Sequence, residues 1–377
     1  MGPAEYGGPV YRIGDSGEAV AEIIGKLQRL RLLDDTPRWV YDEATAVAVR
    51  GFQQQRGLVV DGIVGPQTYR ALDEARWRLG DRLLTYVPSH PMMGDDVLTL
   101  QSRLQELGFA VARIDGIFGP DTQRAVTELQ RNLGLPSDGT CGPSTFKALE
   151  RIRPMATGGR PDALRASEAV RQAGPRLSGK TVVIDPGHGG YDHGWEGHGL
   201  READIAYDLA ARIEGRLGAT GVRAYLSRGR EHGPDELSRA RFANETDANL
   251  CVSLHTDGSA NPHAQGVATY YYGADLHGAY SSVGEQFAGL VQREIVARTD
   301  LRDCRTHAKT WDLLRRTKMP AVRLEIGYVT NYHDAARLAD PTFRDVVAEA
   351  IVVAVQRVYL PPEQDAATGM LRLGQLI

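Results

Sequence analysis

An internal repeat in the N-terminal part of the chain constrains its fold more than any other feature of the sequence. The block LQRL returns as LQEL 77 residues later, and the same offset carries VRGFQQQRGL onto VTELQRNLGL. It also carries DGIVGPQT, which begins at Asp61, onto DGTCGPST, which begins at Asp138. One register that holds across three blocks indicates two copies of a single small module. We place these copies at residues 12–75 and 90–152.

Each copy has the pattern of short helices joined by tight turns. An Asp-Gly pair fits a turn in which the glycine takes a positive φ, and the Gly-Pro that follows fits a helix whose first residue is proline. A further DGIFGPDT, from Asp115, lies inside the second copy, whereas the matching stretch of the first copy has lost its Gly-Pro. Apolar residues such as Leu27 and Phe52, or Leu104 and Leu129, give the helices one apolar face each. The pattern predicts two compact all-α modules of three helices.

From Lys180 onward the pattern changes to strands that alternate with helices. Strand-like segments are TVVID, VRAYLSR, NLCVSLH, GVATYYYG and AVRLEIGYVTN, and helical patterns fall between them and over residues 342–359. This alternation predicts an α/β domain with a mostly parallel central sheet. We place that domain at residues 179–360. A Gly-, Pro- and Arg-rich linker with room for one short helix precedes it at 153–178, and a tail follows at 361–377.

Composition and charge exclude several classes of function. The chain has 44 Lys and Arg against 48 Asp and Glu, so it lacks the basic excess that nucleic-acid binding needs. Its longest apolar runs have the length of a strand and fall short of the roughly 20 residues of a membrane span. The N-terminus lacks the features of a secretory signal, and the odd number of cysteines does not suggest a disulfide framework. We therefore expect a cytoplasmic protein that neither spans a membrane nor binds nucleic acid.

Two histidines and two glutamates stand where an α/β domain builds its sites. His188 follows the first predicted strand, His255 ends the third, Glu325 lies late in the fifth, and Glu202 opens the helix after the first. If these strands are parallel and adjacent, the four side chains can converge at their carboxyl ends. Two imidazoles and a carboxylate form the ligand set of a catalytic zinc site, and a further carboxylate can act as general base. Without a metal, a glycine turn explains the first histidine and the helix dipole explains the helix-start carboxylate.

The blocks VVIDPGHGGYDHG, LREADIAYDLA, SLHTD and MPAVRLEIGYVTN resemble the zinc-dependent N-acetylmuramoyl-L-alanine amidases of the amidase 3 type. The resemblance implies one zinc ion per chain, with His188, Glu202 and His255 as its ligands and Glu325 as the catalytic carboxylate. It also implies hydrolysis of the amide between N-acetylmuramic acid and L-alanine in peptidoglycan or its precursors. Two aspartates, Asp185 and Asp257, lie close to these residues in the sequence. They either orient the ligands or form turns.

The repeated module also resembles a known family. An F/L-Q-x-x-x-G-L stretch followed by D-G-x-x-G-P-x-T is similar to the peptidoglycan-binding domain type 1, which accompanies many cell-wall hydrolases. The resemblance implies that the modules hold the polymer. Each residue of the pattern is equally explained by a turn or a helix cap, so spacing alone assigns no residue to a binding groove.

A regulatory function is the alternative, because cross-linked peptidoglycan lies outside the membrane and the sequence begins without an export signal. The order of two modules, linker, amidase domain and tail resembles a group of mycobacterial and actinobacterial proteins that control peptidoglycan precursor synthesis. This resemblance implies MurA, the enolpyruvyl transferase of the first committed step, as a partner and phosphorylation by a Ser/Thr kinase as the switch. In the tail, Thr368 is the candidate phosphosite, and a frayed terminus without function is the competing interpretation.

Overall fold

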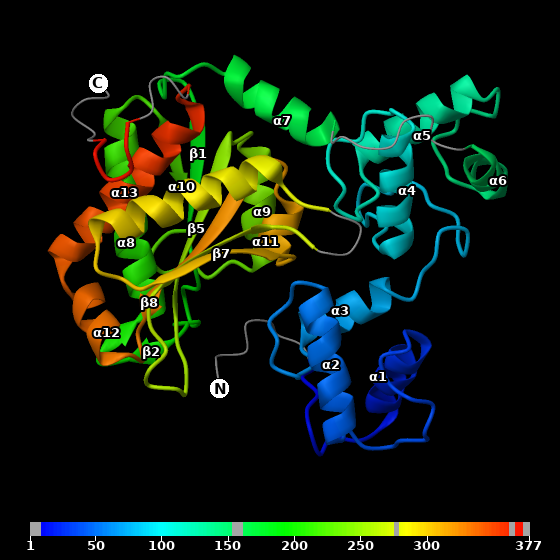
Figure 1. The fold of residues 1–377 in the computed structure, drawn as a ribbon, viewed down its shortest axis with the longest axis horizontal. Helices are drawn as coiled ribbons and strands as arrows, with labels where there is room; N and C mark the ends of the chain where they lie inside the picture. Colours follow the sequence, from blue (N-terminus) through cyan, green and yellow to red (C-terminus); the bar gives the residue numbers. More distant parts are fainter. Residues whose placement is uncertain (1–8, 153–160, 275–278, 362–365, 372–377) are drawn as a thin grey trace. The chain divides into compact units, whose positions relative to one another are not determined.

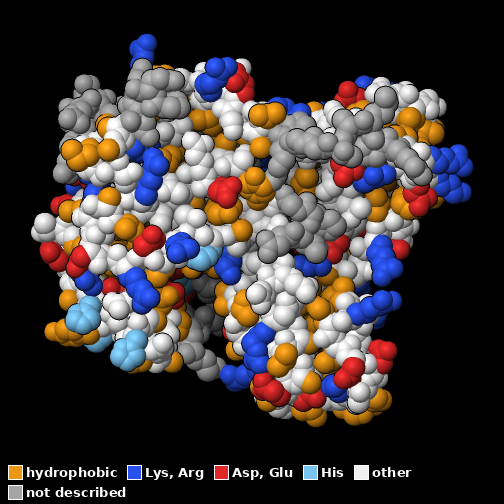
Figure 2. Space-filling view, viewed as in Figure 1, with side chains coloured by type: hydrophobic (Ala, Val, Ile, Leu, Met, Phe, Trp, Pro, Cys, Tyr) orange, Lys and Arg blue, Asp and Glu red, His pale blue; other side chains and the backbone are white. Residues whose placement is uncertain are grey.

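The computed structural model describes residues 9–152, 161–274, 279–361 and 366–371. The chain divides into two compact units, an N-terminal helical unit and a C-terminal α/β unit (Figure 1). On the face shown in Figure 2, side chains of Lys and Arg are interspersed with those of Asp and Glu, in keeping with the near balance of the two signs in the sequence.

In the part of the chain that the structure describes, each copy of the repeat contains three helices. The first copy holds α1 (Glu18–Arg29), α2 (Glu43–Gln55) and α3 (Pro66–Glu74), and the second holds α4 (Asp95–Glu106), α5 (Pro120–Asn132) and α6 (Pro143–Arg151). The proline of each Gly-Pro is the first residue of its helix, as predicted. Each copy also buries its own hydrophobic cluster. The predicted all-α fold of this part is confirmed.

A buried glutamine explains why Asp-Gly and Thr recur at fixed spacing. The Nε2 of Gln53 donates to Asp61 Oδ1 (2.7 Å) and to Thr68 Oγ1 (3.2 Å), and its Oε1 accepts the backbone N–H of Gly62 (2.9 Å). Gln53 is 1% exposed, so its polar atoms have to find their partners within the protein. The D-G-x-x-G-P-x-T motif therefore supplies the hydrogen-bond partners of a glutamine on the preceding helix.

The same arrangement occurs twice in the second copy. Gln130 makes the equivalent hydrogen bonds within DGTCGPST, and Gln101 makes them within DGIFGPDT. In the first copy, the position equivalent to Gln101 is occupied by Ile24, and the Gly-Pro of that turn is missing too. The glutamine and its turn are thus present together or absent together.

We expect Gln53→Ala to loosen the turn that follows α2, because the N–H groups of Asp61 and Gly62 lose their acceptor. The free energy of local opening should fall by about 1–3 kcal/mol, the cost of leaving buried polar groups unsatisfied. Hydrogen exchange of the intact chain, followed by mass spectrometry, measures this over residues 58–66. Gln54→Ala, at the exposed neighbouring position, is the control. Equal protection in the two variants would contradict the role of the glutamine.

The α/β unit is built on a sheet with the strand order β4-β1-β5-β8-β6-β7. The strands β4, β1, β5 and β8 are parallel, β6 is antiparallel to β8, and β7 is parallel to β6, so the predicted mostly parallel sheet is confirmed. Their bounds are β1 (Thr181–Pro186), β4 (Arg223–Leu226), β5 (Leu250–Asp257), β6 (Val267–Tyr272), β7 (Asp303–Lys309) and β8 (Ala321–Tyr328). A separate antiparallel pair consists of β2 (Glu196–Gly197) and β3 (Leu200–Arg201). The sequence did not predict β7, because the segment DCRTHAK is polar.

Alternation along the strands separates two faces of the sheet. Val182 and Ile184 of β1 pack in the large core with α8 (Glu202–Ala219), α10 (Ser282–Arg298) and α13 (Pro341–Tyr359). Val183 and Cys251 face the other way, toward α9 (Glu236–Glu245) and α11 (Asp312–Arg316). Since side chains alternate with a period of two, the odd-numbered residues of β1, β5 and β8 share this second face. That face carries the polar chemistry described below.

Two helices complete the described part of the chain. In the segment predicted as a linker, α7 (Pro161–Gln172) is the short helix, and residues 153–160 lie outside the described residues. After β8 comes α12 (Tyr332–Ala339), whose N-terminus is capped by the side chain of Asn331. Although α13 is buried along much of its length, neither it nor any other helix of the described residues is long and apolar enough to cross a membrane.

Candidate metal centre

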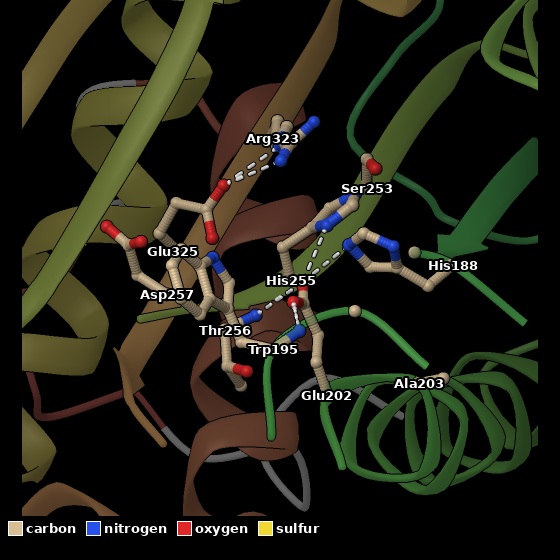
Figure 3. Close-up of polar contacts among 12 residues, drawn as sticks. His188, Trp195, Glu202, Ala203, Ser253, His255, Thr256, Asp257, Arg323 and Glu325 are labelled. Carbon is tan, nitrogen blue, oxygen red and sulfur yellow. Dashed lines mark hydrogen bonds and ion pairs between the residues drawn. The ribbon is translucent and has the colours of Figure 1, made fainter. Parts of the chain in front are cut away.

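The three parallel strands in the middle of the sheet bring the predicted site residues to one edge. His188 follows β1, His255 lies near the end of β5, and Glu325 lies near the end of β8, where it is the register partner of His255. Glu202 is the first residue of α8. The ligand atoms of His188, Glu202 and His255 all lie within 4.8 Å of one another (Figure 3). The predicted convergence of these three side chains is therefore present in the structure.

Glu202 is the centre of this cluster. Its Oε1 lies 2.8 Å from His255 Nδ1 and 3.1 Å from His188 Nε2. Its Oε2 accepts the backbone N–H of Trp195 at 2.9 Å. The other ring nitrogen of His188, Nδ1, lies 2.7 Å from Asp192 Oδ2. A carboxylate behind a histidine fixes the ring and its tautomer, which is the usual arrangement behind a metal-binding imidazole.

The electrostatics of the cluster favour a cation at its centre. Burial opposes the charge of Glu202, but its contacts with both histidines lower its pKa below the ordinary value. Burial likewise opposes the charge of His188, yet hydrogen bonds with Asp192 and Glu202 raise its pKa to about 10. Burial, together with repulsion from Arg323, lowers the pKa of His255 to about 4. A proton on His188 thus balances the buried carboxylate, and two imidazoles with one carboxylate are the donor set that suits zinc.

Glu325 and Asp257 lie beside this cluster. One oxygen of Glu325, Oε1, lies 2.9 Å from both Nε and Nη2 of Arg323 (Figure 3). Asp257 accepts the N–H of Gly258 at 2.7 Å and hydrogen-bonds to Tyr328, its register partner on β8. Burial raises the pKa of Asp257. The hydrogen bond between Asp257 and Tyr328 therefore joins the end of β5 to the end of β8.

Comparison with known proteins identifies the family. Residues 182–357 match the N-acetylmuramoyl-L-alanine amidase family of the amidase 3 type, and residues 16–72 and 93–149 match a peptidoglycan-binding domain family. The whole chain is 46% identical to N-acetylmuramoyl-L-alanine amidase CwlM of Mycobacterium tuberculosis (strain ATCC 25618 / H37Rv) and covers 96% of that protein. The chain belongs to the N-acetylmuramoyl-L-alanine amidase family. Both resemblances read from the sequence, to the amidases and to the peptidoglycan-binding domains, are confirmed.

Other relatives match about half of the chain. N-acetylmuramoyl-L-alanine amidase LytC of Bacillus subtilis (strain 168) is 31% identical over 49% of this chain and 37% of its own length. Among solved structures, N-acetylmuramoyl-L-alanine amidase AmiC2 of Nostoc punctiforme is 32% identical, with a TM-score of 0.44 over 48% of this chain and 97% of that one.

In this amidase, Asp185 acts on the His188 loop through an arginine. The carboxylate is buried, accepts the hydroxyl of Ser253 (2.6 Å), contacts Ser227 and pairs with Arg239 Nη1 (2.8 Å). Burial opposes its charge, but Arg239 and the two serines lower its pKa to about 2. The other end of the same guanidinium, Nη2, donates to the carbonyl of His188 at 2.6 Å. Asp185 therefore supports the loop that carries His188, rather than the imidazole itself.

A second buried arginine holds the same loop and was missed by sequence reasoning, as was Arg239. Arg228 donates to the carbonyls of Pro186 (2.8 Å), Gly187 (2.8 Å) and Ala203 (3.0 Å). It thereby joins the end of β1 to the first turn of α8, which carries Glu202. The sequence signal for Arg228 was weak, because it was a single charged residue directly after the strand-like VRAYLS.

Two glycines leave the space that the ligand side chains occupy. A Cβ added at Gly187 would stand 2.5 Å from His255 Nδ1, although the φ of Gly187 is not in the positive region. A Cβ added at Gly194, whose φ is +68°, would stand 2.7 Å from His188 Cδ2. The glycine of D-P-G-H is therefore required by the neighbouring imidazole and not by its own backbone conformation.

The candidate phosphosite Thr368 is exposed, in a turn near the end of the described chain. The backbone around it is held by buried arginines: Arg357 donates to the carbonyls of Ala366 (2.8 Å) and Ala367 (2.9 Å), and Arg298 donates to that of Leu371 (2.6 Å). The backbone of residues 366–371 is therefore held by hydrogen bonds, and phosphorylation of Thr368 stays a prediction. Met370 lies in this described segment and is exposed, whereas Leu373, Leu376 and Ile377 lie outside the described residues.

We expect Gly187→Ala to displace the His255 ring and to lower the affinity of the cluster for zinc. Changes to the residues that orient metal ligands typically reduce metal affinity by about 10–100-fold. Competition titration with a chromophoric chelator measures the zinc dissociation constant. Gly289→Ala in α10, where an added Cβ meets open space, is the matched control and should leave the constant unchanged. Equal affinity in both variants would show that the His255 ring does not depend on this space.

Proposed function

We propose that this amidase hydrolyses the amide between N-acetylmuramic acid and L-alanine in peptidoglycan or its precursors. One zinc ion per chain is held by His188, Glu202 and His255, with Glu325 as the catalytic carboxylate. The observation that carries the proposal is the buried cluster of these three ligand side chains, whose donor atoms lie within 4.8 Å of one another in a domain of the amidase family.

The residues of the site divide the chemistry between them. A bound zinc ion supplies Lewis acidity toward the substrate carbonyl and toward water. Glu325 takes the proton of the attacking water and returns it to the departing amine, as a general base and then a general acid. Asp192 keeps Nε2 of His188 turned toward the cluster, and Arg239 and Arg228 hold the backbone on which that histidine stands.

We also propose that the two helical modules, residues 12–75 and 90–152, hold the glycan polymer while the domain at 179–360 cuts its stem peptides. The match of both copies to a peptidoglycan-binding domain family supports this division. The buried glutamines are structural in this proposal, since their polar groups are used within the turns. Ligand contacts then come from other residues of the modules.

A regulatory role is the second candidate. The hydrogen bonds that hold residues 366–371 of the tail favour it. A phosphate on Thr368 adds about −1.5 to −2 units of charge to a turn whose backbone is held by Arg298 and Arg357. The added charge would fall on a turn whose backbone already accepts hydrogen bonds from two buried arginines. This candidate places the chain in the cytoplasm, with MurA and a Ser/Thr kinase as partners, and leaves amidase activity weak or absent.

We expect Glu325→Ala to lose hydrolysis by a factor of about 10² or more, the usual scale for a general acid–base group. The variant should still hold one zinc per chain when zinc is in excess, because the three ligands remain. Muropeptide cleavage followed by chromatography measures the rate, and elemental analysis measures the metal. Glu245→Ala, at the exposed end of α9, is the control. A Glu325→Ala protein as active as the parent would remove this role.

Removal of the metal separates the two candidate functions. Under the amidase proposal, a chelator abolishes muropeptide cleavage and added Zn²⁺ restores it, because the three ligands are useless to catalysis without their ion. The regulator predicts instead a purified protein that contains zinc and cleaves no muropeptide. Elemental analysis and the cleavage assay on the same preparation distinguish the outcomes. Cleavage that survives complete removal of metal would refute the metal-dependent mechanism.

A further inference from the structure

Arg323 engages the proposed catalytic carboxylate directly. It stands two residues before Glu325 on β8, so both side chains leave the same face of the sheet. Its Nε and Nη2 each lie 2.9 Å from Glu325 Oε1. Figure 3 shows both contacts ending on this one oxygen, while the other oxygen is turned away from the guanidinium. The two side chains are largely buried, and burial strengthens the interaction between their charges.

Arg323 is itself fixed by two further elements. Its Nη1 lies 3.3 Å from Oε1 of Glu236, the first residue of α9. The Oε2 of Glu236 in turn accepts the backbone N–H of Leu313 in α11, at 3.3 Å. On its flat face, the guanidinium carbon lies 4.5 Å from the centre of the Trp311 ring. Contacts from α9, from Trp311 at the N-cap of α11 and from its own strand therefore hold the arginine in place beside Glu325.

The charge of Arg323 extends to the cluster of ligands. Its register partner on β5 is Ser253, two residues before His255 and on the same face. The guanidinium contacts Glu325, which is the register partner of His255, so its charge lies beside the cluster. A positive charge in this place repels a divalent cation at the cluster by the Coulomb interaction. In addition, the pair with Arg323 cancels the negative charge that Glu325 would otherwise contribute to the site.

We propose that Arg323 is a counter-charge that restrains this site, so that the site binds its divalent cation more weakly and turns over more slowly than its ligand set alone would allow. The inference rests on the proposed amidase function. The slower turnover has a physical reason. A guanidinium that donates to a carboxylate stabilises its charged form, and the carboxylate then accepts a proton less readily. Arg323 is thus a positioning residue that acts through Glu325.

The test compares variants that keep or remove the charge. Arg323→Met removes it with a side chain of similar reach, and Arg323→Lys keeps it without the forked contact. Arg212→Met, which breaks another arginine–carboxylate pair on α8, is the matched control. We expect Arg323→Met to bind Zn²⁺ about tenfold more tightly. This is the size of the Coulomb interaction between one charge and the ion across a distance that is partly buried. Arg323→Lys and Arg212→Met should bind Zn²⁺ like the parent protein, in competition titrations with a chelator.

Two further variants keep the test informative if Arg323→Met folds poorly. Glu325→Gln removes one negative charge beside the cluster, while Arg323 keeps Glu236 as an ion-pair partner, and should weaken Zn²⁺ binding about tenfold. Arg323→Met combined with Glu325→Gln removes both charges of the pair and should restore the affinity. For turnover of a soluble muropeptide, Arg323→Met should raise kcat severalfold and leave KM unchanged. A merely structural role would not produce this split between kcat and KM.

The outcomes separate this inference from the proposed function. Tighter Zn²⁺ binding by Arg323→Met without cleavage by any variant supports the counter-charge and refutes hydrolysis. Cleavage by the parent protein, together with unchanged or weaker Zn²⁺ binding by Arg323→Met, refutes the counter-charge and leaves hydrolysis standing. A failure of the double variant to restore the affinity lost in Glu325→Gln also overturns the inference.

Discussion

A single buried carboxylate organises the α/β unit. Glu202 is 1% exposed, and an ionised group at such a depth costs several kcal/mol unless its surroundings compensate for the charge. The compensation comes from two imidazoles, supplied by the ends of β1 and β5, and from the backbone N–H groups of Trp195 and Thr256. These partners come from two separate segments, the stretch after β1 and the end of β5, so the folding of one strand edge and the assembly of the site are the same event.

The charged residues that surround this cluster also have partners. Arg228 and Arg239 hold the carbonyls of the loop that carries His188, and Asp185 balances the second of these arginines. On the other side, Arg323 links Glu325 to α9 and to Trp311 at the N-cap of α11. The groups that fix the site are thus mostly charged residues that satisfy backbone carbonyls or one another. We expect a substitution of Arg228, Arg239 or Arg323 to act on the chemistry through the position of a loop or through net charge, and not through contact with substrate.

Sequence reasoning found what is encoded locally and missed what depends on tertiary contact. The alternation of strands with helices, together with residues placed at two strand ends and at a helix start, was enough to predict that His188, Glu202 and His255 come together. The roles of Arg228, Arg239 and Arg323 could not be predicted, because an arginine after a strand, in a helix or within a strand has no spacing that distinguishes a buried clamp from a solvated side chain. The polar strand β7 was missed for a related reason, since its place is set by pairing with β6.

The two candidate functions use the same site and differ mainly in the rate at which that site cleaves a muropeptide. The three side chains of the proposed ligand set lie together, whereas Glu325, the carboxylate proposed for proton transfer, is held by an arginine that two neighbouring elements keep in place. Under the proposed function, a site of this kind can retain a metal ion and bind a muropeptide while cleaving it slowly, because binding then depends on the three ligands and turnover on Glu325. A chain that must recognise peptidoglycan fragments without destroying them has the same requirements. If the proposed roles of both residues hold, the balance between hydrolysis and recognition depends on the Arg323–Glu325 pair.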